Sequence, residues 1–89
     1  MAWIPKHTPL DGLERTERGF QLVPFVDGNG EECSLQQSSA IDDTERGYEQ
    51  PGTSYVWLGL GSSRMHLHRD HVRELVTLLQ QWIATGNFG

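Results

Sequence analysis

The sequence predicts an α+β protein, with a four-stranded antiparallel meander and one C-terminal helix packed on one face of the sheet. Apolar and polar residues alternate over short stretches bounded by glycines, which is typical of half-buried strands. From Val72 to Ile83 the apolar residues instead recur at three- and four-residue spacing, which is typical of an amphipathic helix. The change of period falls directly after Leu67, so the last strand is expected to run straight into its helix.

The first 18 residues are expected to form an extended, irregular N-terminal arm. Pro5, Pro9 and Gly12 disfavour both helix and regular strand pairing there. Four apolar residues in this segment nevertheless suggest that the arm docks on the rest of the chain or on a partner. They are Trp3, Ile4, Leu10 and Leu13.

Residues 19–86 are expected to form a single α+β domain. Its strands cover 19–26, 31–37, 54–60 and 64–68, and its helix runs from about Arg69 to Thr85, followed by Gly86 as the capping residue. Asp27-Gly28-Asn29-Gly30 has the composition of a tight hairpin turn. Pro24 cannot donate to a strand ladder, so it indicates an edge or a bulge. Residues 38–53 are polar and acidic, which predicts a long loop.

The two-residue period separates an apolar face of the sheet from a polar and aromatic face. The apolar face, beneath the helix, is expected to hold Leu22, Cys33, Leu35, Val56, Leu58, Leu60, Met65 and Leu67. Trp82 is expected to close the bottom of this core. One helix covers one face of such a sheet, so the other face is expected to lie open. The candidate ligand- or partner-binding residues on it are Ser34, Gln36, Tyr55, Trp57, Arg64 and His66.

The chemistry of these six side chains favours binding. Arginine suits a phosphate or carboxylate, the aromatic rings suit stacking, and the remaining groups supply hydrogen bonds. Two structural alternatives need no ligand. A homodimer packs sheet to sheet through this face, or the N-terminal arm covers it. Cys33 is expected to be a packed thiol rather than a nucleophile, and we expect no catalytic residue, no cofactor and no enzymatic activity.

Charge and composition limit the function further. The net charge of -5 argues against general nucleic-acid binding, which requires a basic surface. The acids concentrate between Asp27 and Glu49, so this segment is expected to lie against the Arg- and His-rich end, within the chain or across a dimer. A single cysteine, no signal peptide and no apolar run of about 20 residues indicate a soluble cytoplasmic protein without a membrane helix.

The string His66-x-His68-x-Asp70-His71 matches the HxHxDH string of metallo-β-lactamase-fold hydrolases. That fold is a much longer four-layer sandwich, and its metal sites take further ligands from distant loops. A metal-dependent hydrolase at these four residues is therefore the least favoured alternative. A structural zinc site at the same residues is a separate alternative. Otherwise the two strand histidines are surface groups that can bind a ligand or titrate near neutral pH.

A longer pattern carries a family resemblance. It consists of Phe25-Val26-Asp27, Gly30, Cys33-Ser34-Leu35-Gln36, Ser38-Ser39, Trp57-Leu58-Gly59, Arg64-Met65-His66-Leu67 and a helix ending in Thr85-Gly86. This pattern, over about residues 25–86, resembles a group of small, mostly uncharacterised proteins of tailed bacteriophages. His68 departs from the group, in which a small helix-capping residue is usual.

The resemblance implies a phage or prophage origin and an accessory role in the host cytoplasm. The expected function is non-enzymatic binding by a homodimer that inhibits host defence, through a host protein or by sequestering a nucleotide. The alternative from another class is a structural or assembly protein whose open sheet face is a permanent seam between copies.

Overall fold

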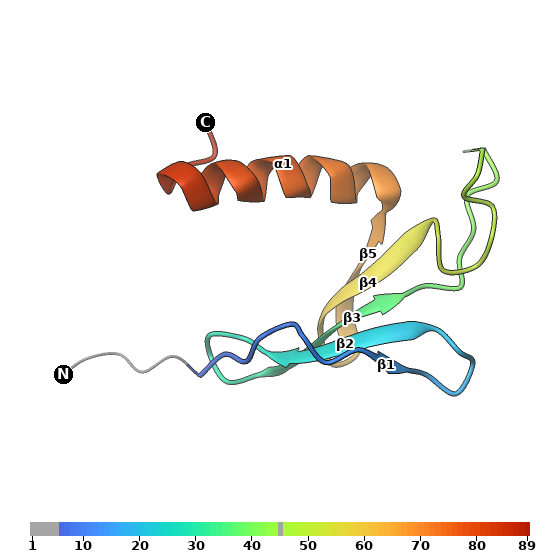
Figure 1. Ribbon diagram of the computed structural model, residues 1–89, viewed down its shortest axis with the longest axis horizontal. Helices are drawn as coiled ribbons and strands as arrows, with labels where there is room; N and C mark the ends of the chain where they lie inside the picture. The colour runs from blue at the N-terminus through green and yellow to red at the C-terminus, as the bar shows by residue number, and fades with distance from the viewer. Residues whose placement is uncertain (1–5, 45) are drawn as a thin grey trace.

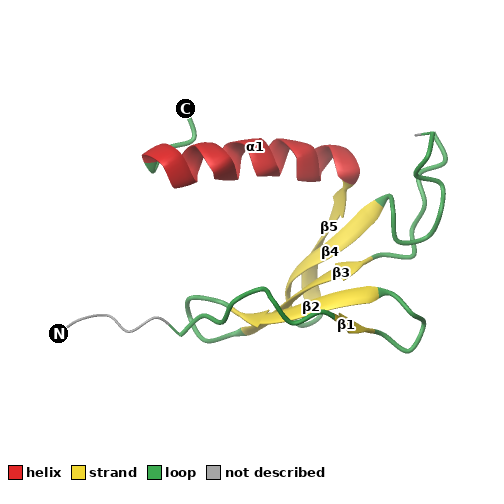
Figure 2. Cartoon of the chain, in the orientation of Figure 1, coloured by secondary structure: helices red, strands yellow, loops and turns green. Residues whose placement is uncertain are grey.

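The computed structural model describes residues 6–44 and 46–89 and shows an antiparallel sheet followed by one C-terminal helix (Figures 1 and 2). The elements are β1 Glu14–Arg15, β2 Gln21–Val26, β3 Glu32–Gln37, β4 Tyr55–Leu60, β5 Ser63–His68 and α1 Arg69–Thr85. Each strand pairs with the next one along the chain, in the order β1-β2-β3-β4-β5. The predicted α+β class and meander are confirmed, but the sheet has five strands instead of four.

The additional strand lies inside the segment predicted to be irregular. β1 pairs with the beginning of β2. Thr16 closes the turn between them, because its N–H donates to the Phe20 carbonyl (2.8 Å) and its hydroxyl accepts from the Phe20 N–H (3.1 Å). Both residues of β1 are charged and exposed, so this strand has no alternating apolar pattern by which the sequence could reveal it.

Thr8 also binds the N-terminal segment to the outer edge of β2. Its N–H donates to the Val26 carbonyl (3.0 Å), and its hydroxyl accepts from the Val26 N–H (2.8 Å). Because backbone groups alternate in direction along a strand, the nitrogen of Pro24 faces this same outer edge. β1 does not reach Pro24, and the pairing of β2 with β3 is unbroken, so the proline is accommodated without a bulge. Trp3 and Ile4 fall outside the described residues.

The helix has the predicted bounds. Gly86 follows it with φ of 78°, the left-handed conformation of a helix cap, and its N–H donates to the Trp82 carbonyl (2.7 Å). At the other end His68 is the N-cap, and its Nδ1 accepts from the Asp70 N–H (3.1 Å). His68 therefore fills the capping role that a small polar residue usually has.

The prediction that the helix covers a face of the sheet is wrong for the single chain. α1 packs against β5 and then runs away from it as a separate arm (Figure 1). No residue of the helix is buried, and the partly buried apolar ones, Val72 and Leu75, lie in its first half. Trp82 is half exposed and does not close a core.

The apolar face of the sheet is largely as predicted, although it is not buried. On one face the register places Leu58 between two apolar residues, Leu35 and Met65. On the same face it pairs Val56 with Leu67 and Leu60 with Cys33. Leu22 is a wrong assignment: it lies opposite Gln36 on the other face, while Val23 and Phe25 occupy the apolar face. Within the described residues no apolar side chain is buried. We define the apolar face as Val23, Phe25, Cys33, Leu35, Val56, Leu58, Leu60, Met65 and Leu67.

Candidate functional site

The six predicted binding residues share the opposite face of the sheet. The pairing of β3, β4 and β5 aligns Gln36 with Trp57 and Trp57 with His66. Arg64 and Tyr55 flank this line on the same face, because residues two apart along a strand point the same way. The alternation in the sequence therefore located these side chains correctly, although their contacts required the register between the strands.

Four of these side chains stack into a continuous row. The His66 ring lies between Trp57 (4.0 Å between ring centres, 24° between planes) and Tyr55 (4.6 Å, 16°). The guanidinium carbon of Arg64 lies 5.2 Å from the centre of the Trp57 ring, which is a cation–π geometry. We call Arg64, Trp57, His66 and Tyr55 the aromatic row. It is a strip of rings with a fixed positive charge at one end.

Two polar residues fix the aromatic row in place. Gln36 accepts a hydrogen bond from Nη1 of Arg64 at 2.7 Å. The hydroxyl of Ser38 lies 2.8 Å from Nε2 of His66 and also accepts from the Ala40 N–H, so it can donate its own proton to the ring. Ser38 is buried, and the sequence analysis did not single it out as a site residue. The sequence indicates Ser38 only by its position, because it directly follows the second predicted strand, in which polar residues alternate.

Ser34 lies on the same face but apart from the aromatic row. It is paired with Gly59, and Gly59 is paired with Arg64, so a glycine separates the serine from the guanidinium. A Cβ at Gly59, which has φ of 139°, would lie 3.3 Å from the Arg64 Cα. The absence of a side chain at Gly59 therefore lets the backbone of β5 approach closely at Arg64, the charged end of the row. Ser34 itself lines a different hollow, with Phe25 and Gly61.

The four residues of the HxHxDH string are not brought together. His66 is stacked in the aromatic row, while His68 faces Asp42 and caps the helix. Asp70 forms an ion pair with Arg73. His71 lines a hollow between the helix and β5. Across residues 6–44 and 46–89, no group of three His, Cys, Asp or Glu side chains could hold a metal ion.

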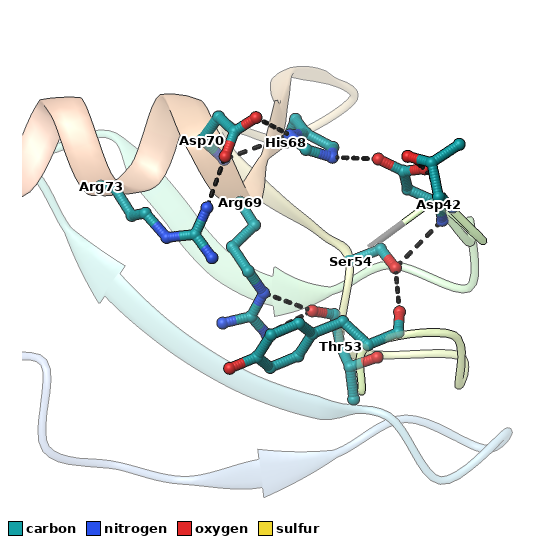
Figure 3. Close-up of polar contacts among 9 residues, drawn as sticks. Asp42, Thr53, Ser54, His68, Arg69, Asp70 and Arg73 are labelled. Carbon is teal, nitrogen blue, oxygen red and sulfur yellow. Dashed lines mark hydrogen bonds and ion pairs between the residues drawn. The ribbon is translucent and has the colours of Figure 1, made fainter. Parts of the chain in front are cut away.

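A second polar cluster ties the long loop to the junction of β5 and α1 (Figure 3). Nε2 of His68 lies 2.7 Å from Oδ2 of Asp42, so a single neutral tautomer donates to the carboxylate and accepts from the Asp70 N–H. The hydroxyl and N–H of Thr44, followed by His68, lower the pKa of Asp42 to about 2. The expected contact between the acidic segment and the Arg- and His-rich end is confirmed here, within one chain.

Arg69 supplies the other half of this junction. Its Nε and Nη2 both donate to the Thr53 carbonyl, the Nε bond at 3.0 Å, and its guanidinium carbon lies 3.6 Å from the centre of the Tyr48 ring. Its N–H donates to the Ser54 carbonyl (3.0 Å). The buried Ser54 hydroxyl donates to the Tyr48 carbonyl (2.5 Å) and accepts from the Asp42 N–H (3.0 Å). The loop is thus anchored beside the helix start.

Cys33 lies on the apolar face and is partly buried. Partial burial, together with the charge of nearby Asp27, raises the pKa of its thiol. The thiol therefore stays protonated at neutral pH, which does not favour a nucleophilic role.

Comparison with known proteins gave no match to a protein family, to a characterised protein or to a solved structure. Within the described residues, the helix lacks the length and apolar character needed to cross a membrane.

Proposed function

We propose that this chain is a non-enzymatic binding protein that holds a partner protein against its aromatic row. The observation that carries the proposal is the row itself, which lies on a sheet face that α1 does not cover. Tryptophan, tyrosine and arginine contribute most of the binding energy at protein interfaces. Here Gln36 and Ser38 hold the row in one arrangement, so binding loses little side-chain entropy.

The stacking favours a protein partner over a small planar ligand. His66 already occupies the space between Trp57 and Tyr55, so a nucleotide base would have to displace it before stacking there. A protein surface can instead lie across the outer edges of the rings. Sequestration of a nucleotide is the second candidate, because the guanidinium at the end of the row could meet a phosphate.

The resemblance to small proteins of tailed phages supports the biological context of this proposal. In that context the chain is an accessory protein acting in the host cytoplasm, and the partner class is a protein of the host defence. A permanent seam through the aromatic row is a weaker alternative, since this face carries the charged Glu32 and Arg64, and charged residues are depleted from interface cores.

Affinity capture with matched variants tests the proposal. The immobilised protein and its Trp57→Ala, Arg64→Gln and Arg18→Gln variants are exposed to lysate of a susceptible bacterium. Arg18 is an exposed arginine outside the aromatic row. We expect a bacterial protein to be retained by the wild type and Arg18→Gln, and roughly thirtyfold less by the first two variants. Equal retention by all four proteins would refute the proposal.

A nucleotide panel at millimolar concentration distinguishes the second candidate. A rise in the midpoint of thermal unfolding that disappears in Arg64→Gln would favour sequestration of a nucleotide. Circular dichroism of each variant confirms that the fold is retained.

A further inference from the structure

We propose that the apolar stripe of α1 and the apolar face of the sheet form an interface between two copies of this chain. In this homodimer α1 of each copy lies across the apolar face of its partner. The inference goes beyond the proposed function, because it uses neither the aromatic row nor its partner. It rests on the exposed area of the single chain, on where its charges lie and on the direction of its helix.

The single chain exposes more surface than a folded monomer of its size. A monomeric protein of 10.1 kDa exposes about 5,300 Å². This chain exposes 6815 Å², which is about 1,500 Å² more. Burial of this excess between two copies would remove about 3,000 Å² from solvent, which is within the range of permanent homodimer interfaces. The radius of gyration is 15.0 Å, against about 12 Å for a compact chain of this length, so the single chain is also less compact than a folded monomer.

The apolar face across β2–β5 and the helix beyond Glu74 have no charged side chain, although the chain as a whole has a net charge of -5. After Glu74 the sequence contains no ionisable side chain, so no side chain of the second half of the helix or of the tail is charged. Every residue of β2–β5 that points to the apolar face is also uncharged. Two acidic chains can therefore meet here without placing like charges in contact, as the core of an interface requires.

The helix cannot cover the sheet of its own chain without leaving its present direction. It begins at the residue that follows β5, so no linker allows it to fold back. The His68 cap and the bonds of Arg69 to Thr53 and Ser54 fix that direction. As a result Val72 and Leu75 lie near β5, whereas the later part of the stripe is exposed. The exposed residues are Val76, Leu78, Leu79, Trp82 and Ile83.

A second copy fits these surfaces better than an unrelated partner does. The 17 residues of α1 span about 25 Å, enough to cross four strands spaced about 4.8 Å apart. In a dimer with a two-fold axis, the helix of each copy covers the sheet of the other copy. One association therefore covers both apolar surfaces of each chain. A hollow of about 310 Å³ between α1 and β5 leaves room for side chains of the partner. It is lined by Met65, His66, Leu67, His71, Glu74, Leu75 and Leu78.

Sedimentation equilibrium of the wild type and two helix variants tests the interface. We expect the wild type to have the mass of two chains. Leu79→Glu places a charge in the stripe and should weaken association roughly thirtyfold or more. Gln81→Glu adds the same charge on the opposite side of the helix and should remain a dimer. Trp57→Ala should also remain a dimer, which separates this inference from the aromatic row.

Cross-linking identifies the surfaces even if Leu79→Glu fails to fold. Wild type, whose one cysteine lies on the apolar face, is co-expressed with a Cys33→Ser/Leu79→Cys chain and treated with a short bismaleimide. We expect a covalent heterodimer, and much less of it with a Cys33→Ser/Gln81→Cys chain.

A folded wild-type monomer at tens of micromolar would overturn the inference, as would equal cross-linking of both cysteine variants. A dimer lost in Trp57→Ala but retained in Leu79→Glu would also overturn it and move the seam to the aromatic row.

Discussion

His68 connects three parts of the molecule at a single side chain. Its Nδ1 caps α1, its Nε2 holds Asp42 of the long loop, and its ring lies edge-on to Tyr55 at 5.0 Å. A serine or threonine at this position could supply the cap, but it is too short to bind the loop as well. The two nitrogens of the imidazole explain why a histidine can stand where a small capping residue is usual.

Substitutions at His68 separate these roles. His68→Ser should keep a helix cap while losing the bond to Asp42, whereas His68→Ala should lose both. We expect the alanine variant to be less stable than the serine variant by about 1 kcal/mol, the usual contribution of an N-cap. Urea denaturation of the two variants measures this difference, and equal stabilities would show that the cap contributes nothing here.

Asp42 makes the stability of the folded state depend on pH in the acidic range. Its bonds to Thr44 and His68 lower the pKa from the usual 3.8 to about 2, so they favour the folded state while the carboxylate is charged. This contribution is complete above pH 3.8 and is lost as the pH falls toward 2. We expect Asp42→Asn to flatten the loss of stability in this window, and Asp43→Asn, at an exposed neighbouring acid, to retain it. Thermal unfolding between pH 5 and about pH 2 measures both slopes.

At the scale of the elements, the strands and the helix were predictable because local patterns specify them. Alternation and glycine turns bound the strands, and Gly86 marks the end of the helix. β1 was not predictable, since Glu14 and Arg15 form a strand through backbone pairing alone. Leu22 was misplaced because the hairpin turn sets the register, and this register puts Phe25 opposite Cys33.

For the candidate site, the sequence predicts only which face of the sheet carries the side chains. A two-residue period indicates which side chains share a side of the sheet, but stacking depends on pairing between strands. The turn at Gly61 sets Trp57 opposite His66, and this register lets the imidazole enter between two rings of β4. The direction of the helix depends on the contacts of Arg69 with the long loop, and no periodicity in the sequence encodes these.

The left-handed cap at the end of α1 can be tested directly. Gly86 has φ of 78°, and a Cβ there would meet no other atom, so the cost of a side chain is purely conformational. We expect Gly86→Ala to reduce stability by about 1 kcal/mol. Gly12→Ala, in an equally open position without positive φ, is the control and should have little effect. Urea unfolding compares the two, and equal changes would contradict the cap.

At the scale of the whole molecule, the sheet separates two kinds of surface. One face carries the aromatic row together with Glu32 and Arg64. Across β2–β5 the other face is mostly apolar and has no charged side chain, and neither has the second half of α1. Because the apolar side chains of the described residues are at most partly buried, the single chain has less hydrophobic stabilisation than a domain with a fully buried core. Folding and association are therefore expected to be one process.

Coupled folding and association make the unfolding temperature depend on protein concentration. At about 0.7 kcal/mol per residue, a dimer of this chain would unfold with an enthalpy of about 125 kcal/mol. Mass action then raises the unfolding midpoint by about 4 °C for each tenfold increase in concentration. Differential scanning calorimetry over a hundredfold range measures this shift, with Gln81→Glu behaving as the wild type does. A midpoint independent of concentration would mean that the chain is stable without a partner copy, and that the exposed stripe of α1 needs a different explanation.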